Sequence, residues 1–210
     1  MEQSDPLSGR KEHIIMYGKY IKRLLDFLIS AIGIIVLLPI WIVVPILIKI
    51  DDNGPVFYLA PRIGKGSKKN MMYKFRSMKV DNEDIRNADG STYNAKNDPR
   101  VTKIGRILRK TSIDELPQLF NVIRGEMSLI GPRASTWDML ETYKSDEIDK
   151  MKVLPGITGY CQAYFRNDIP ARDKRIKDAW YANNVSFLLD LKIFFKTIDT
   201  VCRHKNLYTN

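Results

Sequence analysis

Two adjacent carboxylates, Asp114 and Glu115, are the side chains with the most evident potential for chemistry, and they precede an apolar stretch expected to be helical. Ser112 and Glu115 have the spacing of a capping box, which would give the acidic pair a purely structural role. Pro117 argues against that interpretation, because with Ser112 as N-cap the proline falls beyond the first turn, where its ring clashes with a backbone carbonyl. With Asp114 as N-cap the proline is tolerated. We therefore expect Asp114 at the N-terminus of a helix.

At a helix N-terminus, the helix dipole and nearby Arg109 would keep the Asp114 carboxylate ionised. An ionised carboxylate can act as a nucleophile or as a metal ligand, and the same helix end would favour a bound phosphate. Spacing alone still favours a structural cap over a catalytic residue.

Few other side chains could carry catalysis. The two histidines, His13 and His204, lie near opposite ends of the sequence, and the two cysteines, Cys161 and Cys202, form no CxxC or Cys/His cluster. A histidine-based triad, a zinc site and a disulfide framework are therefore not indicated. With 34 Lys and Arg against 24 Asp and Glu, the net charge of +10 favours polyanionic partners: nucleic acid, anionic lipid or phosphorylated small molecules.

A long apolar segment must place these residues relative to a membrane. Residues 27–48 contain no charge and, as a helix, would be about 33 Å long. Basic residues flank the segment on both sides, so the positive-inside rule does not choose an orientation. Pro39 predicts a kink in its middle. From these residues alone, a kinked spanning helix and a re-entrant hairpin are equally acceptable.

The rest of the chain reads as a mixed domain. Residues 54–66 and 71–78 predict a β-hairpin, and residues 81–99 a polar loop that is either a lid or a solvated connection. Residues 101–110 predict a basic amphipathic helix, and residues 184–204 an amphipathic helix with an apolar face of Leu188, Leu191, Phe194, Phe195, Ile198 and Val201. For the last helix, core packing is the default interpretation and binding at a membrane interface the alternative.

Several motifs in one order, from about Lys19 to Thr197, together resemble the bacterial sugar transferase family, the monotopic polyprenyl-phosphate phosphoglycosyl transferases. The motifs are the apolar segment with Pro39, Lys74-Phe75-Arg76-Ser77-Met78, Asp98-Pro99-Arg100-Val101-Thr102, Asp114-Glu115-Leu116-Pro117-Gln118-Leu119-Phe120-Asn121, Gly131-Pro132-Arg133 and Pro155-Gly156-Ile157-Thr158-Gly159. The length is similar to that of the small members, which consist of the catalytic core.

The resemblance implies a ping-pong transfer of a sugar 1-phosphate from a UDP-sugar to undecaprenyl phosphate, with release of UMP. Asp114 would be the nucleophile and a ligand of Mg²⁺, and Glu115 its partner in the dyad. Mg²⁺ is expected because an anionic carboxylate must approach an anionic diphosphate. The products would begin a lipid-linked surface glycan.

The resemblance also implies a set of cationic phosphate ligands, whose planar or point charges hold phosphate oxygens. These are Arg109, Arg133 and Arg166, followed by the less specific matches Arg62, Lys74 and Arg76. Tyr160, Tyr164 and Phe165 depart from the family pattern just before Arg166, so the sequence does not specify the sugar. Leu38 and Ala134 depart from it beside Pro39 and Arg133.

The implied fold is α+β and mostly helical, with a re-entrant membrane helix broken at Pro39, a small β-hairpin and amphipathic interfacial helices around a cytoplasmic active site. The expected organisation is a tail at residues 1–18, the membrane helix at 19–50 and the transferase domain at 51–210. The site would lie on the cytoplasmic face of the bacterial inner membrane, in contact with lipid and without nucleic acid as a partner. A non-catalytic membrane scaffold and a membrane-tethered nucleic-acid-binding protein are the competing hypotheses.

Overall fold

A computed structural model describes residues 16–80, 97–166 and 168–203, together with residues 82, 83, 85, 93 and 95. Most of the expected tail at 1–18 and most of the expected loop at 81–99 lie outside the described residues. The helices are α2 (Lys22–Val36), α3 (Leu38–Asp52), α4 (Lys103–Thr111), α5 (Gln118–Arg124), α6 (Tyr160–Tyr164), α7 (Ala171–Asn183) and α8 (Phe187–Cys202). The strands are β1 (Phe57–Ile63), β2 (Lys69–Phe75), β3 (Ser128–Ile130) and β4 (Gly156–Thr158).

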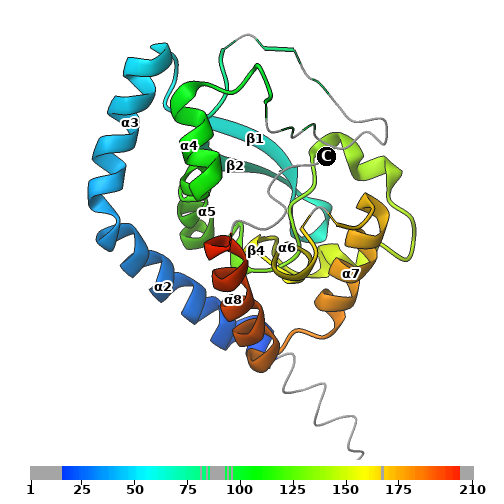
Figure 1. Cartoon of the computed structure of the whole chain (residues 1–210). Coiled ribbons are helices and arrows are strands. Elements are labelled where there is room, and N and C mark those ends of the chain that lie inside the picture. Colours follow the sequence, from blue (N-terminus) through cyan, green and yellow to red (C-terminus); the bar gives the residue numbers. More distant parts are fainter. Residues whose placement is uncertain are drawn as a thin grey trace, which may run out of the picture.

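The apolar segment forms two helices, α2 and α3, that run as a bent arm along one side of the molecule (Figure 1). A helical turn at Tyr17–Ile21 leads into α2, and the two halves of the arm meet at 63°. Within the described residues no single helix is long and apolar enough to cross a membrane, whereas this pair qualifies when its halves are taken together. The expected mixed, mostly helical fold with a small hairpin is confirmed.

The bend lies at Leu37, two residues before Pro39, which becomes the second residue of α3. Proline has no N–H to donate to the carbonyl of Ile35, and its ring clashes there, so the α-helical bonding cannot continue. The indole Nε1 of Trp41 donates to the freed carbonyl of Ile34 at 3.0 Å. This bond satisfies a polar group that the break would otherwise leave without a partner.

Charged residues tie the two ends of this arm to the rest of the molecule. At one end, Lys22 pairs with Asp190 of α8 at 2.5 Å, and Arg23 donates to the carbonyl of Ile123 at 2.8 Å. At the other end, the Asp51 carboxylate accepts from the backbone N–H of Ile104 at 2.9 Å. Both ends are therefore anchored on the same body.

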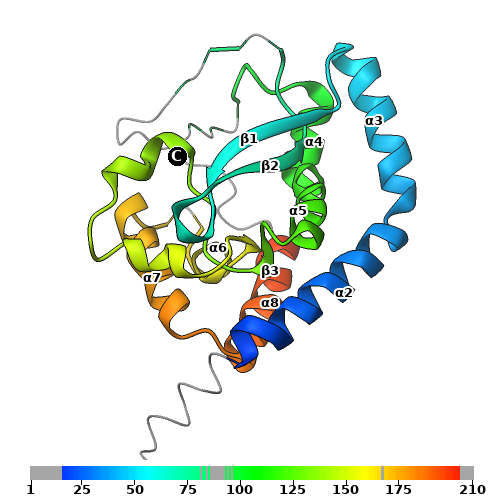
Figure 2. The same ribbon diagram turned by 180° about the vertical axis from the view of Figure 1, so that it is seen from behind.

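The β-hairpin is confirmed, with Phe57 opposite Phe75 and Ile63 opposite Lys69. Its register places Arg62, opposite Asn70, and Lys74 on one face, because residues two apart in a strand share a face. On that face Ala60 and Met72 are buried against Val122 of α5 and Met127. Figure 2 shows the hairpin from the side opposite to Figure 1, and β2 packs against α5. A second, two-stranded parallel sheet pairs β3 with β4, which the sequence did not predict.

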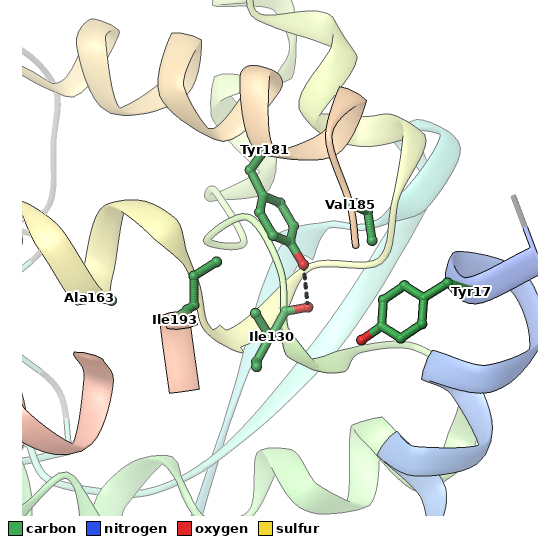
Figure 3. Close-up of a cluster of buried hydrophobic side chains, with 6 residues drawn as sticks. All are labelled: Tyr17, Ile130, Ala163, Tyr181, Val185 and Ile193. Carbon is green, nitrogen blue, oxygen red and sulfur yellow. Dashed lines mark hydrogen bonds between the residues drawn. The ribbon is translucent and has the colours of Figure 1, made fainter. Parts of the chain in front are cut away.

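A buried cluster joins α6, α7 and α8 to the first helical turn. Its members are Tyr17, Ile130, Ala163, Tyr181, Val185 and Ile193, and Figure 3 shows the Tyr181 hydroxyl pointing at the carbonyl of Ile130, 3.3 Å away. The Asp190 carboxylate accepts from both Tyr181, at 2.6 Å, and Tyr17, at 2.7 Å.

The default interpretation of the last helix, core packing of its predicted apolar face, is wrong. Buried positions of α8 are Asp190, Ile193 and Thr200, whereas Leu188 and Phe195 are 68% and 60% exposed. The contact of α8 with the core is narrow: it consists of Ile193 and of the hydrogen-bonded side chains of Asp190 and Thr200. The broad apolar face is left outside. The apolar face of the helix predicted at 101–110 is also only partly buried, because Leu108 is buried and Ile107 is exposed.

Candidate active site

The acidic pair lies on a tight turn between α4 and α5. Ser112 ends α4 with a left-handed φ of 58°, a 3₁₀ turn follows at Ile113–Glu115, and α5 begins only after Pro117. The sequence led us to expect Asp114 as the N-cap of an α-helix. That expectation is wrong, because Asp114 is the middle residue of a 3₁₀ turn. The reason is again proline: Pro117 cannot donate to the carbonyl of Ile113, and the N–H of Leu116 donates there instead, at 3.1 Å.

The capping box is not formed, since Ser112 makes no side-chain cap. The carboxylate of Glu115 instead pairs with Lys74 of β2, with 2.6 Å between Oε1 and Nζ. The turn before α5 thus meets the hairpin through two residues that lie 41 positions apart in the sequence. Because the Glu115 side chain pairs with a lysine, it does not cap the local backbone. The interpretation of the acidic pair as part of a capping box is therefore not supported.

Burial and nearby charge act differently on the two carboxyls. Burial raises the pKa of Asp114 to about 6; Lys74 and Arg109 oppose the shift, and Glu115 adds to it. Burial would also raise the pKa of Glu115, but Lys74, Arg133 and Arg62 outweigh it and bring that pKa to about 2. The pKa of Asp114 is raised on balance, because desolvation exceeds the attraction of the cations. Asp114 is still mostly ionised at neutral pH.

Five of the six expected cations gather around this pair. Lys74 and Arg109 lower the pKa of Asp114, while Arg62 and Arg133 lower that of Glu115. The Nε of Arg109 also donates to the Ser77 hydroxyl at 3.0 Å. Arg166, in a left-handed conformation with φ 45° at the end of α6, has its pKa lowered by burial and partly restored by Glu115.

Arg76, the sixth expected cation, has a different role. Its buried guanidinium pairs with Asp52 at the end of α3 and donates to the carbonyls of Pro55, at 2.6 Å, and Met78, at 2.9 Å. It fixes the end of the apolar arm to the end of β2. The sequence motif that suggested a phosphate ligand could not distinguish it from Lys74, two residues away.

Asn121 is a positioning residue whose role the sequence did not reveal. Its fully buried amide accepts from the N–H of Tyr73 at 2.9 Å and donates to the carbonyl of Met71 at 2.8 Å. These bonds fasten α5, which follows Glu115, to β2, which carries Lys74. The asparagine at the end of the Asp-Glu-Leu-Pro-Gln-Leu-Phe-Asn motif was the available signal.

Three glycines explain how two further motifs meet. A Cβ on Gly131 would lie 2.4 Å from the carbonyl oxygen of Leu154, one on Gly156 2.1 Å from the nitrogen of Gly131, and one on Gly159 1.9 Å from the oxygen of Gly131. Only backbones without side chains can pack this closely. The Gly-Pro-Arg and Pro-Gly-Ile-Thr-Gly motifs are therefore one packed unit, with Arg133 at its surface.

A magnesium ion would find two adjacent carboxylates at this site. In the part of the chain that the structure describes, no group of three Asp, Glu, His or Cys side chains could hold a metal. Mg²⁺ commonly takes one or two carboxylates together with substrate phosphates and water. Asp114 and Glu115 fit an ion of that kind, bound together with a diphosphate.

A buried carboxylate with a cluster of arginines and a lysine has the chemistry that suits a phosphorylated ligand. Residues 17–204 match the family model described as bacterial sugar transferase, and the chain belongs to that family. The expectation of a transferase enzyme is thereby confirmed.

Individual relatives support the same assignment. The chain is 38% identical over 202 residues to the exopolysaccharide production protein ExoY of Rhizobium meliloti, covering 91% of this chain and 89% of that one. It is 37% identical to the undecaprenyl-phosphate galactose phosphotransferase of Salmonella typhimurium, covering 91% of this chain and 42% of the relative. For the UDP-N-acetylgalactosamine-undecaprenyl-phosphate N-acetylgalactosaminephosphotransferase of Aeromonas hydrophila the identity is 39%, over 87% and 44%. The chain thus spans less than half of several relatives.

Proposed function

We propose that this protein transfers a sugar 1-phosphate from a UDP-sugar to undecaprenyl phosphate and releases UMP. The observation that carries the proposal is the Asp114–Glu115 pair, with Asp114 buried and five cations from five different segments of the chain acting on one or other of the two carboxyls. The names of the Salmonella and Aeromonas relatives supply the two substrate classes. The products would begin the synthesis of a lipid-linked glycan.

In the first step, an Asp114 oxygen attacks the sugar-bearing phosphorus of the donor. A phosphorus–oxygen bond forms, the bond to the bridging oxygen breaks, and UMP leaves with that oxygen and its electron pair. In the second step, a phosphate oxygen of undecaprenyl phosphate attacks the same phosphorus, and the Asp114 carboxylate is released. Neither step consumes a proton, so a carboxylate mostly ionised at neutral pH is a suitable nucleophile.

The cations would reduce the electrostatic repulsion between the reacting groups in these two steps. A carboxylate, a diphosphate and an acceptor phosphate repel one another, and fixed guanidinium and ammonium groups offset that repulsion without reorganising. Mg²⁺, when bound at Asp114 and Glu115, would neutralise further charge on the leaving UMP. Glu115 keeps Lys74 in place next to the nucleophile.

We propose that the α2–α3 arm enters and leaves the cytoplasmic leaflet of the bacterial inner membrane on one side. Its outer surface consists of exposed large apolar side chains, among them Ile32, Ile35, Val36, Ile42 and Ile46. A spanning arrangement would separate the two ends, which are both anchored by charged residues on the same body. The bend and these anchors therefore favour the re-entrant arrangement over a kinked spanning helix.

The test is UMP release from a panel of UDP-sugars by protein in nanodiscs with undecaprenyl phosphate and Mg²⁺. We expect one donor to react and Asp114→Asn to lose about 10³-fold or more in rate, whereas Asp146→Asn, an exposed acid paired with Arg172, keeps its rate. A donor carrying ³²P on the sugar-bearing phosphate should label wild-type protein stoichiometrically without acceptor.

Two results would contradict the proposal. UMP release by Asp114→Asn at the wild-type rate would exclude Asp114 as nucleophile. Folded wild-type protein that reacts with no donor would favour the membrane scaffold.

A further inference from the structure

A buried ion pair holds the backbone of Arg133 from both sides. The Asp178 carboxylate accepts from the N–H of Arg133 at 3.2 Å, and the Lys150 ammonium donates to the carbonyl of Arg133 at 3.0 Å. Lys150 and Asp178 face each other at 3.6 Å, with 7% and 3% of their side chains exposed. The only two hydrogen-bonding groups in the Arg133 backbone are thus both bound by opposite charges.

The two holding residues come from separate elements. Lys150 belongs to a 3₁₀ helix at Ile148–Lys152, and Asp178 to the middle of α7. Lys150 also donates to the hydroxyls of Ser135, at 3.2 Å, and Tyr143, at 3.3 Å. The two elements thus hold the peptide at Arg133 by its N–H and by its carbonyl.

Stability alone gives little reason for this arrangement, because burying two charges costs about as much as their attraction returns. The geometry of the ion pair instead fixes the position of the Arg133 backbone. Pro132 is fully buried and Gly131 is packed against the backbone of residues 154–156, so the chain before Arg133 cannot shift. With its backbone fixed, Arg133 is free only in its exposed side chain, which lies close enough to Glu115 to lower the pKa of that carboxyl.

We propose that Lys150 and Asp178 are positioning residues that aim the Arg133 guanidinium at the diphosphate of the donor nucleotide. This inference rests on the proposed function, because it takes Arg133 as a phosphate ligand. The two residues touch no substrate and act only through Arg133.

A double-mutant cycle tests this role, with calorimetric binding of UDP to the full-length protein in nanodiscs as the readout. We expect Arg133→Ala and Lys150→Met each to weaken UDP binding by about 10- to 100-fold. The double variant should bind no more weakly than Arg133→Ala, because Lys150 has no route to the ligand except Arg133. Lys152→Met, an exposed lysine two residues along the same helix, is the matched control and should bind normally.

Each outcome separates the possibilities. If Lys150→Met binds UDP as tightly as wild type, or if its loss adds fully to that of Arg133→Ala, the positioning role is wrong. If Lys150→Met does not fold, Asp178→Asn replaces it in the same cycle, since it keeps the side-chain volume and removes the charge. Wild-type protein that binds no UDP would count against the proposed function itself.

Discussion

Asp114 and Glu115 are neighbours in the chain, yet their pKa values differ widely. Burial raises the pKa of Asp114, whereas three cations lower the pKa of Glu115. One carboxyl is thus desolvated, and the other is held ionised. The separation has consequences both for stability and for activity.

The stability consequence has opposite signs for the two residues. The folded-state pKa of Asp114 is raised to about 6, so folding favours its protonated form, and its contribution to stability is lost as pH rises through about 6. We expect Asp114→Asn to increase the free energy of unfolding by about 1–3 kcal/mol at pH 7.5 without divalent metal, with the difference vanishing below about pH 4.

Glu115→Gln is the matched comparison. The pKa of Glu115 is lowered to about 2, so its contribution is present above the unfolded value and lost as pH falls toward 2. This variant should therefore be less stable than wild type at pH 7.5. Denaturant unfolding from pH 3 to 8 measures both, and an Asp114→Asn protein less stable than wild type at pH 7.5 would contradict the burial argument.

The activity consequence involves Lys74. UMP release should fall about tenfold per pH unit below the pKa of Asp114, because only the ionised carboxylate attacks. Lys74 is the cation that lowers that pKa most, so Lys74→Met should move the acidic limb to higher pH. Lys68→Met, a change at an exposed lysine in the hairpin turn, should leave the limb in place. An unchanged pH profile for Lys74→Met would show that its charge does not act on the nucleophile.

At the scale of elements, the local periodicities predicted which elements form, and Pro39 predicted the bend in the apolar arm, whereas Pro45 lies inside α3 without ending it. The hairpin, the helix after the acidic pair and the bend near Pro39 followed from residues within a few positions of each other. The contacts that build the site did not, because Lys74 reaches Glu115 over 41 positions and Asp178 reaches Arg133 over 45. For the same reason the sequence assigned Arg76 to the phosphates, although its partner, Asp52, lies at the end of the apolar arm.

The bent arm supports a prediction about topology. Proline in a helix costs about 3 kcal/mol, and breaking a buried ion pair such as Lys22 with Asp190 costs about 3–5 kcal/mol. The two energies are similar, so we expect neither the bend nor the ion pair alone to determine the topology of the arm. We expect Pro39→Ala with Asp190→Asn to straighten the arm in more molecules than either single variant.

The measurement is labelling of a cysteine at Met16 in intact cells with a membrane-impermeant reagent, in a background without Cys161 and Cys202. Wild-type arms should be protected, and a cysteine at Asn53, just past α3, should stay protected in every variant. Protection of Met16→Cys in the double variant equal to that in wild type would mean that something other than the bend and the anchor sets the topology.

At the scale of the whole molecule, α8 has three faces rather than the two of an ordinary amphipathic helix. One packs on the core through Ile193, one carries charged side chains such as Lys192, and the third is the exposed apolar face. Its members are Phe187, Leu188, Leu191, Phe194, Phe195 and Ile198, each between 40% and 68% exposed. A soluble protein rarely leaves so many large apolar side chains in water, and together with the outer surface of α2 and α3 they form the pattern of a helix seated in a membrane interface.

A seating of α8 in a membrane interface would give two residues on one turn of the helix different environments. Phe194 and Lys192 are two positions apart and so point about 200° away from each other around α8. A fluorophore attached to Phe194→Cys in nanodiscs should be quenched by quenchers in the lipid chains, whereas one on Lys192→Cys should be quenched by iodide in water. Equal access of iodide to both positions would place α8 away from the membrane. Lipid quenching at position 194 would instead put α8, like the arm, at the depth where the phosphate of a long-chain lipid acceptor is held, and so explain how one site can meet a soluble donor and a membrane-bound acceptor.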